Sequence, residues 1–194
     1  MCQFKSGIAV KTDSGVTVLT SPFTDSHEHL VCLYKLKDNG QTNSRNWVRV
    51  EYSRKPAGDI FDLDDYQLTL DDNCEPLWWE DRKAEVARQM RRVVERAILT
   101  AGADLRVGEE LLVPAGVVLA RTLFCRVVAV AGTVREVGRG GTVWEVHTGG
   151  TVQRVHAGGT VWEVHAGGTV REVGDGGTVQ RVRAGGTVQK DDNS

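Results

Sequence analysis

Residues 131–189 read AGTVREVGR GGTVWEVHT GGTVQRVHA GGTVWEVHA GGTVREVGD GGTVQRVRA GGTVQ, a nine-residue unit of the form GGTVxxVxx in six copies and part of a seventh. Of the chain's 22 glycines, 15 lie after residue 130. Glycine-rich repeats are often flexible linkers, but Val occupies positions four and seven of every full copy, and β-branched residues favour strands. Stacked strands with an apolar seam and glycine corners are typical of a β-solenoid, which we predict for this region.

The charges at position six indicate how many units form one coil. Equivalent residues of successive coils lie about 4.8 Å apart, so like charges there repel each other. An 18-residue coil of two units gives four opposite-charge neighbours and one like pair, whereas coils of one or three units give a poorer pattern. The two predicted columns are Glu136, Arg154, Glu172, Lys190 and Glu145, Glu163, Arg181. We therefore predict two units per coil, with Trp144 stacked on Trp162.

The chain divides by composition into two regions. Residues 1–112 lack the repeat and carry most of the aromatic residues, so we predict a small α+β domain there. Residues 113–194 form the predicted solenoid. Within it, residues 113–130 are apolar and have the length of one coil, which indicates a degenerate first coil or a cap. Residues 131–189 are the regular repeats, and residues 190–194 are a polar tail.

The first domain has alternating and helical patterns in the order ββαββα. Two short alternating runs flank a Thr-Asp-Ser-Gly turn, which predicts a hairpin. A helix is expected after Thr24 or Asp25 as its N-cap, and a second helix has apolar residues at helical spacing. For Trp78 and Trp79 we expect one ring in the core and the other near the domain junction. The predicted elements are strands 7–11, 15–20, 47–52 and 66–70, a helix entering at 24–28, and a helix over 79–99.

The charge balance excludes some classes of protein. The chain has 24 Lys and Arg against 26 Asp and Glu, and from residue 131 onward there are 7 of each. Neither region is a polybasic nucleic-acid binder, and no nucleic-acid partner is expected. No secretory signal or membrane-spanning run is visible, and the four cysteines contain no C-x-x-C pair. We therefore expect a cytoplasmic protein, in the host cytoplasm if it is viral.

The candidate binding residues lie in the repeats. Stacked aromatic rings beside fixed charges resemble the energetic centre of a protein interface. An alternative is that the aromatic stack only stabilises the solenoid. The predicted partner-binding residues are Trp144, Trp162, Glu145, Glu163 and Arg181.

No metal, cofactor or catalytic constellation is predicted. Calcium-binding nonapeptide repeats carry Asp at position six, where this chain has Glu, Arg or Lys. His27 and His29 are two residues apart at a helix start, so they point to different sides and are interpreted as part of a capped helix. His147, His165 and Arg183 share one predicted column and His156 lies in the other. Such a column is consistent with metal binding or pH sensing, but we interpret these residues as surface side chains at the corners.

The segments MCQFKSGIAV, TDSHEHL and WVRVEY, with the GGTVxxV units, resemble uncharacterised bacterial and bacteriophage proteins that join a small N-terminal domain to short degenerate repeats. The resemblance implies no catalytic activity. We expect a non-enzymatic scaffold or interaction module that binds a protein partner. Self-assembly through docking of solenoids is the alternative, and an enzyme in the N-terminal domain is the least favoured one.

Overall fold

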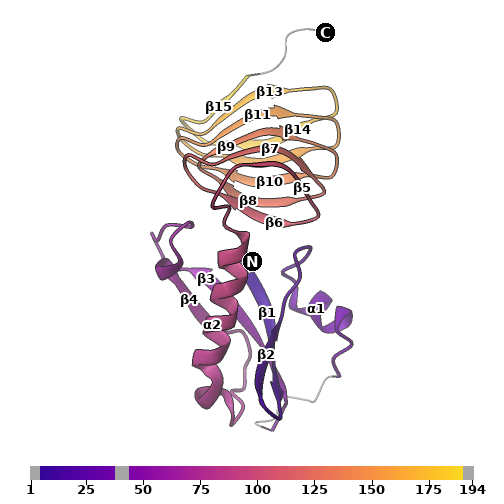
Figure 1. Cartoon of the computed structure of the whole chain (residues 1–194), viewed down its shortest axis with the longest axis vertical. Coiled ribbons are helices and arrows are strands. Elements are labelled where there is room, and N and C mark those ends of the chain that lie inside the picture. Colours follow the sequence, from indigo (N-terminus) through magenta and orange to yellow (C-terminus); the bar gives the residue numbers. More distant parts are fainter. Residues whose placement is uncertain (1–4, 38–43, 190–194) are drawn as a thin grey trace. The chain divides into compact units, whose positions relative to one another are not determined.

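A computed structural model describes residues 5–37 and 44–189 (Figure 1). The chain forms two compact units, Met1–Arg96 and Ala97–Ser194. The predicted polar tail of residues 190–194, including Lys190 of one charge column, lies outside the described residues.

The N-terminal unit contains a four-stranded antiparallel sheet in the order β2-β1-β3-β4. The predicted hairpin is confirmed, because β1 and β2 pair with Thr12 opposite Gly15. A short 3-10 helix, η1, precedes β4 and was not predicted. In chain order the elements are β1 Lys5–Thr12, β2 Gly15–Leu19, α1 His27–Leu33, β3 Trp47–Arg54, η1 Leu63–Asp65, β4 Tyr66–Leu70 and α2 Trp79–Ala97.

The start of α1 differs from the prediction. Its N-cap is Ser26, whose side chain accepts a hydrogen bond from the amide of His29 at 3.3 Å. Thr24 instead accepts from the amide of Ser26 at 3.0 Å. Asp25 is drawn away because its carboxylate lies 3.2 Å from the Nζ atom of Lys5, a side chain only 1% exposed. The need to pair a buried ammonium group therefore outweighs the capping preference of Asp25.

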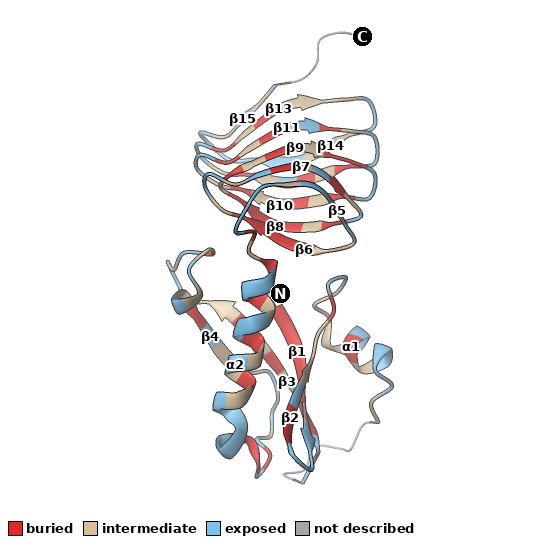
Figure 2. Cartoon of the chain, in the orientation of Figure 1, coloured by how far each residue is buried: buried red, intermediate tan, exposed pale blue. Residues whose placement is uncertain are grey.

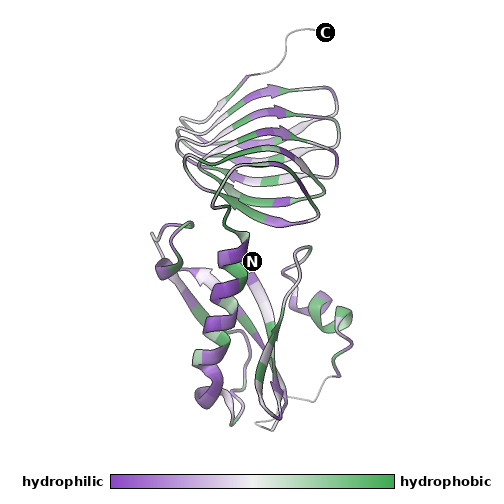
Figure 3. Cartoon of the chain, in the orientation of Figure 1, coloured by the Kyte–Doolittle hydropathy of each residue, from purple (hydrophilic) through white to green (hydrophobic). Residues whose placement is uncertain are grey.

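The long helix α2 has one apolar face, and Figure 3 shows it as mostly hydrophilic with interrupted hydrophobic segments. Val86, Met90 and Val94 follow one another at four-residue spacing and are fully buried, as an amphipathic helix requires. The helix ends at Ala97 rather than Leu99. It ends there because the amide of Leu99 donates to the carbonyl of Leu112 instead of continuing the helical ladder.

Both tryptophans at the start of α2 are buried within the N-terminal unit. Trp78 and Trp79 are 7% and 2% exposed, and their rings meet edge to face with centroids 6.2 Å apart. The indole of Trp78 donates to the carbonyl of Arg45 at 2.8 Å. The prediction that one ring packs near the domain junction is wrong, because the chain leaves this unit at the other end of α2.

The C-terminal unit is a β-solenoid with two parallel sheets, in the orders β14-β12-β10-β8-β6 and β15-β13-β11-β9-β7-β5. Each coil gives one strand to each sheet, so neighbours in a sheet are two repeat units apart. Val143 pairs with Val161, its counterpart two units further along the chain, which confirms the predicted spacing. The strands are β5 Ala103–Val107, β6 Glu110–Val113, β7 Val118–Leu123, β8 Arg126–Val130, β9 Thr133–Val137, β10 Thr142–Val146, β11 Thr151–Val155, β12 Thr160–Val164, β13 Thr169–Val173, β14 Thr178–Val182 and β15 Thr187–Val188.

The valines of positions four and seven form the core of the solenoid. Those from Val134 to Val170 are completely buried in one cluster that both sheets share, and each contributes about 1.5–3 kcal/mol by burial. Figure 2 shows this buried lining along the strands, most completely in β6 and β8. Cys125 belongs to the same cluster, and burial raises the pKa of its thiol.

The two glycines of a corner are required for different structural reasons. In the corner after β10, the amide of Gly150 donates to the carbonyl of His147 at 2.9 Å. Gly149 has φ +79°, the third-residue conformation of a type II turn, which side chains other than glycine rarely adopt. A Cβ on Gly150 would lie 2.1 Å from the carbonyl oxygen of Val130 in the preceding coil. Gly149 is thus required by its positive φ, and Gly150 by the close approach of the neighbouring backbone.

The solenoid begins earlier than predicted. The boundary lies after Arg96 rather than Leu112, because β5 pairs with β7 and β6 pairs with β8. Residues 113–130 supply β7 and β8, so they are a coil rather than an outer cap. The first coil was missed because it is shorter than two repeat units: Leu111 pairs with Val127, 16 residues further along the chain, whereas Val143 pairs with Val161, 18 residues further along.

The predicted charge columns are present in the register of the strands. Arg154 pairs with Glu136 on one side and Glu172 on the other, and Glu163 lies between Glu145 and Arg181. Among the described residues, no helix is both long and apolar enough to cross a membrane.

Candidate functional site

The predicted binding residues lie on the outer side of the sheet that contains β10 and β12. In β10, Val143 and Val146 are both buried, and the two residues between them face outward. The same pattern repeats one coil later in β12. We call Trp144, Glu145, Trp162, Glu163 and Arg181 the tryptophan face, because the coil repeat brings all five residues together.

The two indole rings of this face are stacked. The ring centroids of Trp144 and Trp162 are 5.2 Å apart with an interplanar angle of 8°. Trp162 is 44% exposed, which is high for so large an apolar side chain. A stack of this kind contributes about 0.5–1.5 kcal/mol beyond the area that it buries, yet it leaves a flat aromatic surface open to solvent.

A positively charged side chain lies against one end of the stack, and it was not predicted from the sequence. The guanidinium of Arg126 lies 5.5 Å from the centroid of the Trp144 ring, within cation–π range. Arg126 also forms a 3.2 Å ion pair with Glu110. Both residues belong to the irregular first coils, and the strand register that places Arg126 beside Thr142 would have been needed to find them.

The acidic residues of the face have basic partners. Glu163 forms an ion pair with Arg183, whereas the sequence predicted Arg181 as its neighbour. Arg181 does lie beside Glu163 in the register, but Arg183 from the following corner makes the ion pair. Arg183 has a raised pKa because it donates to Glu163. Glu145 lies 2.8 Å from the Nε2 atom of His147.

Two histidines stack beside the tryptophans. His147 and His165 follow β10 and β12, and their ring centroids are 5.0 Å apart with an interplanar angle of 11°. The Nε2 atom of His165 is 3.7 Å from the same Glu145 oxygen that contacts His147. The column expected from the sequence is therefore present, and a carboxylate lies next to it.

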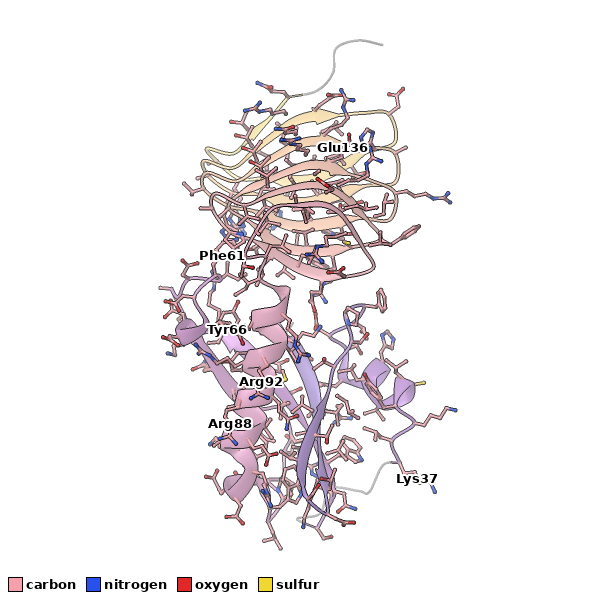
Figure 4. The ribbon with its side chains drawn as sticks, viewed as in Figure 1. Lys37, Phe61, Tyr66, Arg88, Arg92 and Glu136 are labelled. Carbon is pink, nitrogen blue, oxygen red and sulfur yellow. The ribbon has the colours of Figure 1, made fainter. Side chains whose placement is uncertain are left out.

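The opposite sheet carries a ladder of alternating charge. Arg121 contacts Glu136 at 2.6 Å, and Arg154 contacts Glu172 at 2.5 Å. Figure 4 labels Glu136 on the solenoid. The hydrogen bond from Arg121 lowers the pKa of the Glu136 carboxyl. His156 lies 3.6 Å from Glu136, but it has no second histidine in its column, so this side offers charge pairs rather than an aromatic surface.

The candidate histidines of the N-terminal unit do not meet each other. His27 has its Nδ1 atom 3.0 Å from Asp71 and its Nε2 atom 3.1 Å from the carbonyl oxygen of Val50. His29 contacts the hydroxyl of Thr24 at 3.4 Å. Glu51 offers an oxygen within 4.8 Å of the His27 and Asp71 atoms. Because partners occupy both nitrogens of His27, its ring is held in place as part of the sheet packing.

Comparison with known proteins gives no match, whether with protein-family models, with curated proteins or with solved structures. Function must therefore be inferred from the residues of the two units themselves.

Proposed function

We propose that this protein is a non-enzymatic interaction module whose solenoid presents the tryptophan face to a protein partner. The observation that carries the proposal is the Trp144–Trp162 stack, in which Trp162 keeps 44% of its surface exposed. Trp is among the residue types most enriched at the energetic centres of interfaces. A Trp pair that served only to stabilise the coil would be expected to bury more of this surface.

The solenoid backbone supports the proposal by holding the face rigid. The strands beneath the two rings pair in strict register, and the corner amides also bond from coil to coil, as from Gly149 to Gly167 at 3.0 Å. A preorganised surface loses little conformational entropy on binding, so more of the contact energy becomes affinity. The rim of the face is charged, with Glu145, Glu163 and Arg126 around the rings, which suits a partner that has an apolar residue surrounded by polar groups.

Self-association of solenoids is the second candidate. In the described part of the chain, β14 and β15 are the end strands of their sheets, and Val182 of β14 is 46% exposed. Edge strands can pair with a second copy. An enzyme in the N-terminal unit is the least favoured alternative.

The test of partner binding is a pair of matched double variants. Trp144→Ala with Trp162→Ala removes the exposed rings, whereas Gln153→Ala with Arg171→Ala changes the same repeat positions on the opposite sheet. We expect partners captured from the native cell by the wild type to be captured by the second variant and lost with the first. Circular dichroism checks that both variants keep their β signal. Equal capture by both double variants would contradict the proposed face.

Light scattering separates the two candidates. If solenoids dock with each other, the molar mass of the purified wild type rises with concentration. A molar mass that stays at the monomer value excludes self-association and leaves partner binding as the candidate.

A further inference from the structure

We propose that Glu145, His147 and His165 form a binding site for a divalent transition metal ion, with Zn²⁺ as the type ion, that ties two neighbouring coils together. Each residue offers one ligand atom, and these atoms all lie within 4.8 Å of one another. The proposal goes beyond the interaction module and does not depend on it, because metal binding is measurable without any partner.

The distances fit a tetrahedral ion. Metal–nitrogen and metal–oxygen bonds of about 2.0–2.1 Å place neighbouring ligand atoms about 3.3 Å apart. The shared Glu145 oxygen lies 2.8 Å from the Nε2 atom of His147 and 3.7 Å from that of His165, values on either side of that separation. The rings are stacked at 5.0 Å, so a tilt of each ring toward the carboxylate brings both nitrogens to one ion.

The coil repeat holds the two histidines in position. The amide of His147 donates to Val130 and the amide of His165 donates to Val146, both at 2.9 Å. These bonds fix the two corners one strand spacing apart, so the backbone of the site is already in place before an ion binds. The histidine and glutamate side chains are between 24% and 37% exposed, although the Nε2 atoms of both histidines are themselves buried.

The ligand types select the class of ion. Two imidazoles and one carboxylate suit Zn²⁺, Co²⁺, Ni²⁺ or Cu²⁺, whereas Ca²⁺ and Mg²⁺ prefer oxygen ligands alone. Three protein ligands leave a fourth position for water. Arg183, the next residue of the histidine column, is engaged with Glu163, which reduces its repulsion of a cation.

The chain contains a matched control for this site. His156 occupies the same repeat position on the opposite sheet and lies 3.6 Å from Glu136. The residues of its column in the neighbouring coils are Gly138 and Gly174, so a single imidazole faces the carboxylate there. If metal bound nonspecifically to surface histidines, removal of His156 would weaken binding as much as removal of His147 or His165. Binding at the Glu145, His147 and His165 site would be weakened only by the latter two changes.

Titration of the full, untagged chain with Zn²⁺ and Co²⁺ tests the proposal. We expect one ion per chain and the visible absorption of tetrahedral Co²⁺. His147→Ala and His165→Ala should each weaken binding at least about tenfold, because even the loss of a residue that only orients a metal ligand costs about 10–100-fold in affinity. His156→Ala should leave binding unchanged. Binding should also weaken on acidification, because imidazole must be neutral to bind a metal. The variants distinguish this site from thiol ligands elsewhere in the chain.

A second measurement guards against variants that fold poorly. Zn²⁺ should raise the thermal unfolding midpoint of the wild type and of His156→Ala, but not that of the His147→Ala and His165→Ala double variant. Equal Zn²⁺ affinity in the wild type and the double variant would overturn the proposal, as would an equal loss of affinity in His156→Ala.

Discussion

The corner glycines after β10 allow one prediction in which two adjacent, identical substitutions have different costs. Gly149→Ala places a methyl group where the nearest atom lies 4.0 Å away, so its cost comes only from the positive φ. That conformation costs about 1–2 kcal/mol for a residue with a Cβ atom. Gly150→Ala places the methyl 2.1 Å from the Val130 carbonyl oxygen, which also accepts a 2.9 Å hydrogen bond from His147.

The carbonyl of Val130 cannot move without weakening the bond between coils. Overpacking costs about 1–3 kcal/mol and a lost hydrogen bond about 1 kcal/mol more, so Gly150→Ala should destabilise the solenoid by about 2–4 kcal/mol. Gly149→Asn should recover part of the loss seen in Gly149→Ala, because Asn tolerates positive φ. Gly150→Asn should recover nothing.

Urea unfolding followed by circular dichroism measures these four variants against the wild type. In a thermal melt, each 1 kcal/mol of lost stability should lower the unfolding midpoint of a unit of this size by about 4–8 °C. Equal losses for Gly149→Ala and Gly150→Ala would refute the steric argument. A Gly149→Asn variant no more stable than Gly149→Ala would refute the conformational one.

Three further predictions follow from contacts described above. Asp25→Ala should lower the free energy of unfolding by about 3–5 kcal/mol in urea denaturation, because it leaves Lys5 buried without its carboxylate; a loss below about 1 kcal/mol would contradict this. The pKa of Glu136 is lowered, so its contribution to stability is present above the ordinary carboxyl pKa and is lost as the pH falls through the lower value in the folded state. Arg121→Ala should therefore flatten the dependence of the unfolding midpoint on pH between neutral and acid solution, and an unchanged slope would count against the pair. Cys125, whose thiol pKa is raised by burial, should escape iodoacetamide until the chain is unfolded, as peptide mass mapping would show.

The regular part of the solenoid could be predicted because its signals repeat. Invariant Val indicated the core, and the alternation of Glu136, Arg154 and Glu172 indicated the number of units per coil before any strand pairing was known. The prediction ended where the repeat loses its fixed length. In the first coils the spacing falls below two repeat units, as in the pairing of Leu119 with Val134, so no periodic pattern remained to identify β5 and β6.

The candidate site was predicted at the level of columns but not of side-chain partners. Register alone placed Trp144 on Trp162 and His147 near His165. Which charge an acidic residue meets depends on side-chain reach, so Arg183 rather than Arg181 pairs with Glu163. Arg126 was missed because its contact with Trp144 joins an irregular coil to a regular one. In the N-terminal unit, the choice of Ser26 over Asp25 as N-cap depended on Lys5, a residue far away in the sequence.

Because successive repeat units alternate between the two sheets, the solenoid can change its length without changing its faces only by gaining or losing units in pairs. Removal of a single unit, such as 149–157, would send every later strand to the opposite sheet. Trp144 and Trp162 would then lie on opposite sides of the coil, and so would His147 and His165. Adding or removing an even number of units changes only the length of the solenoid. An odd number moves part of each column of outward-facing residues to the opposite sheet.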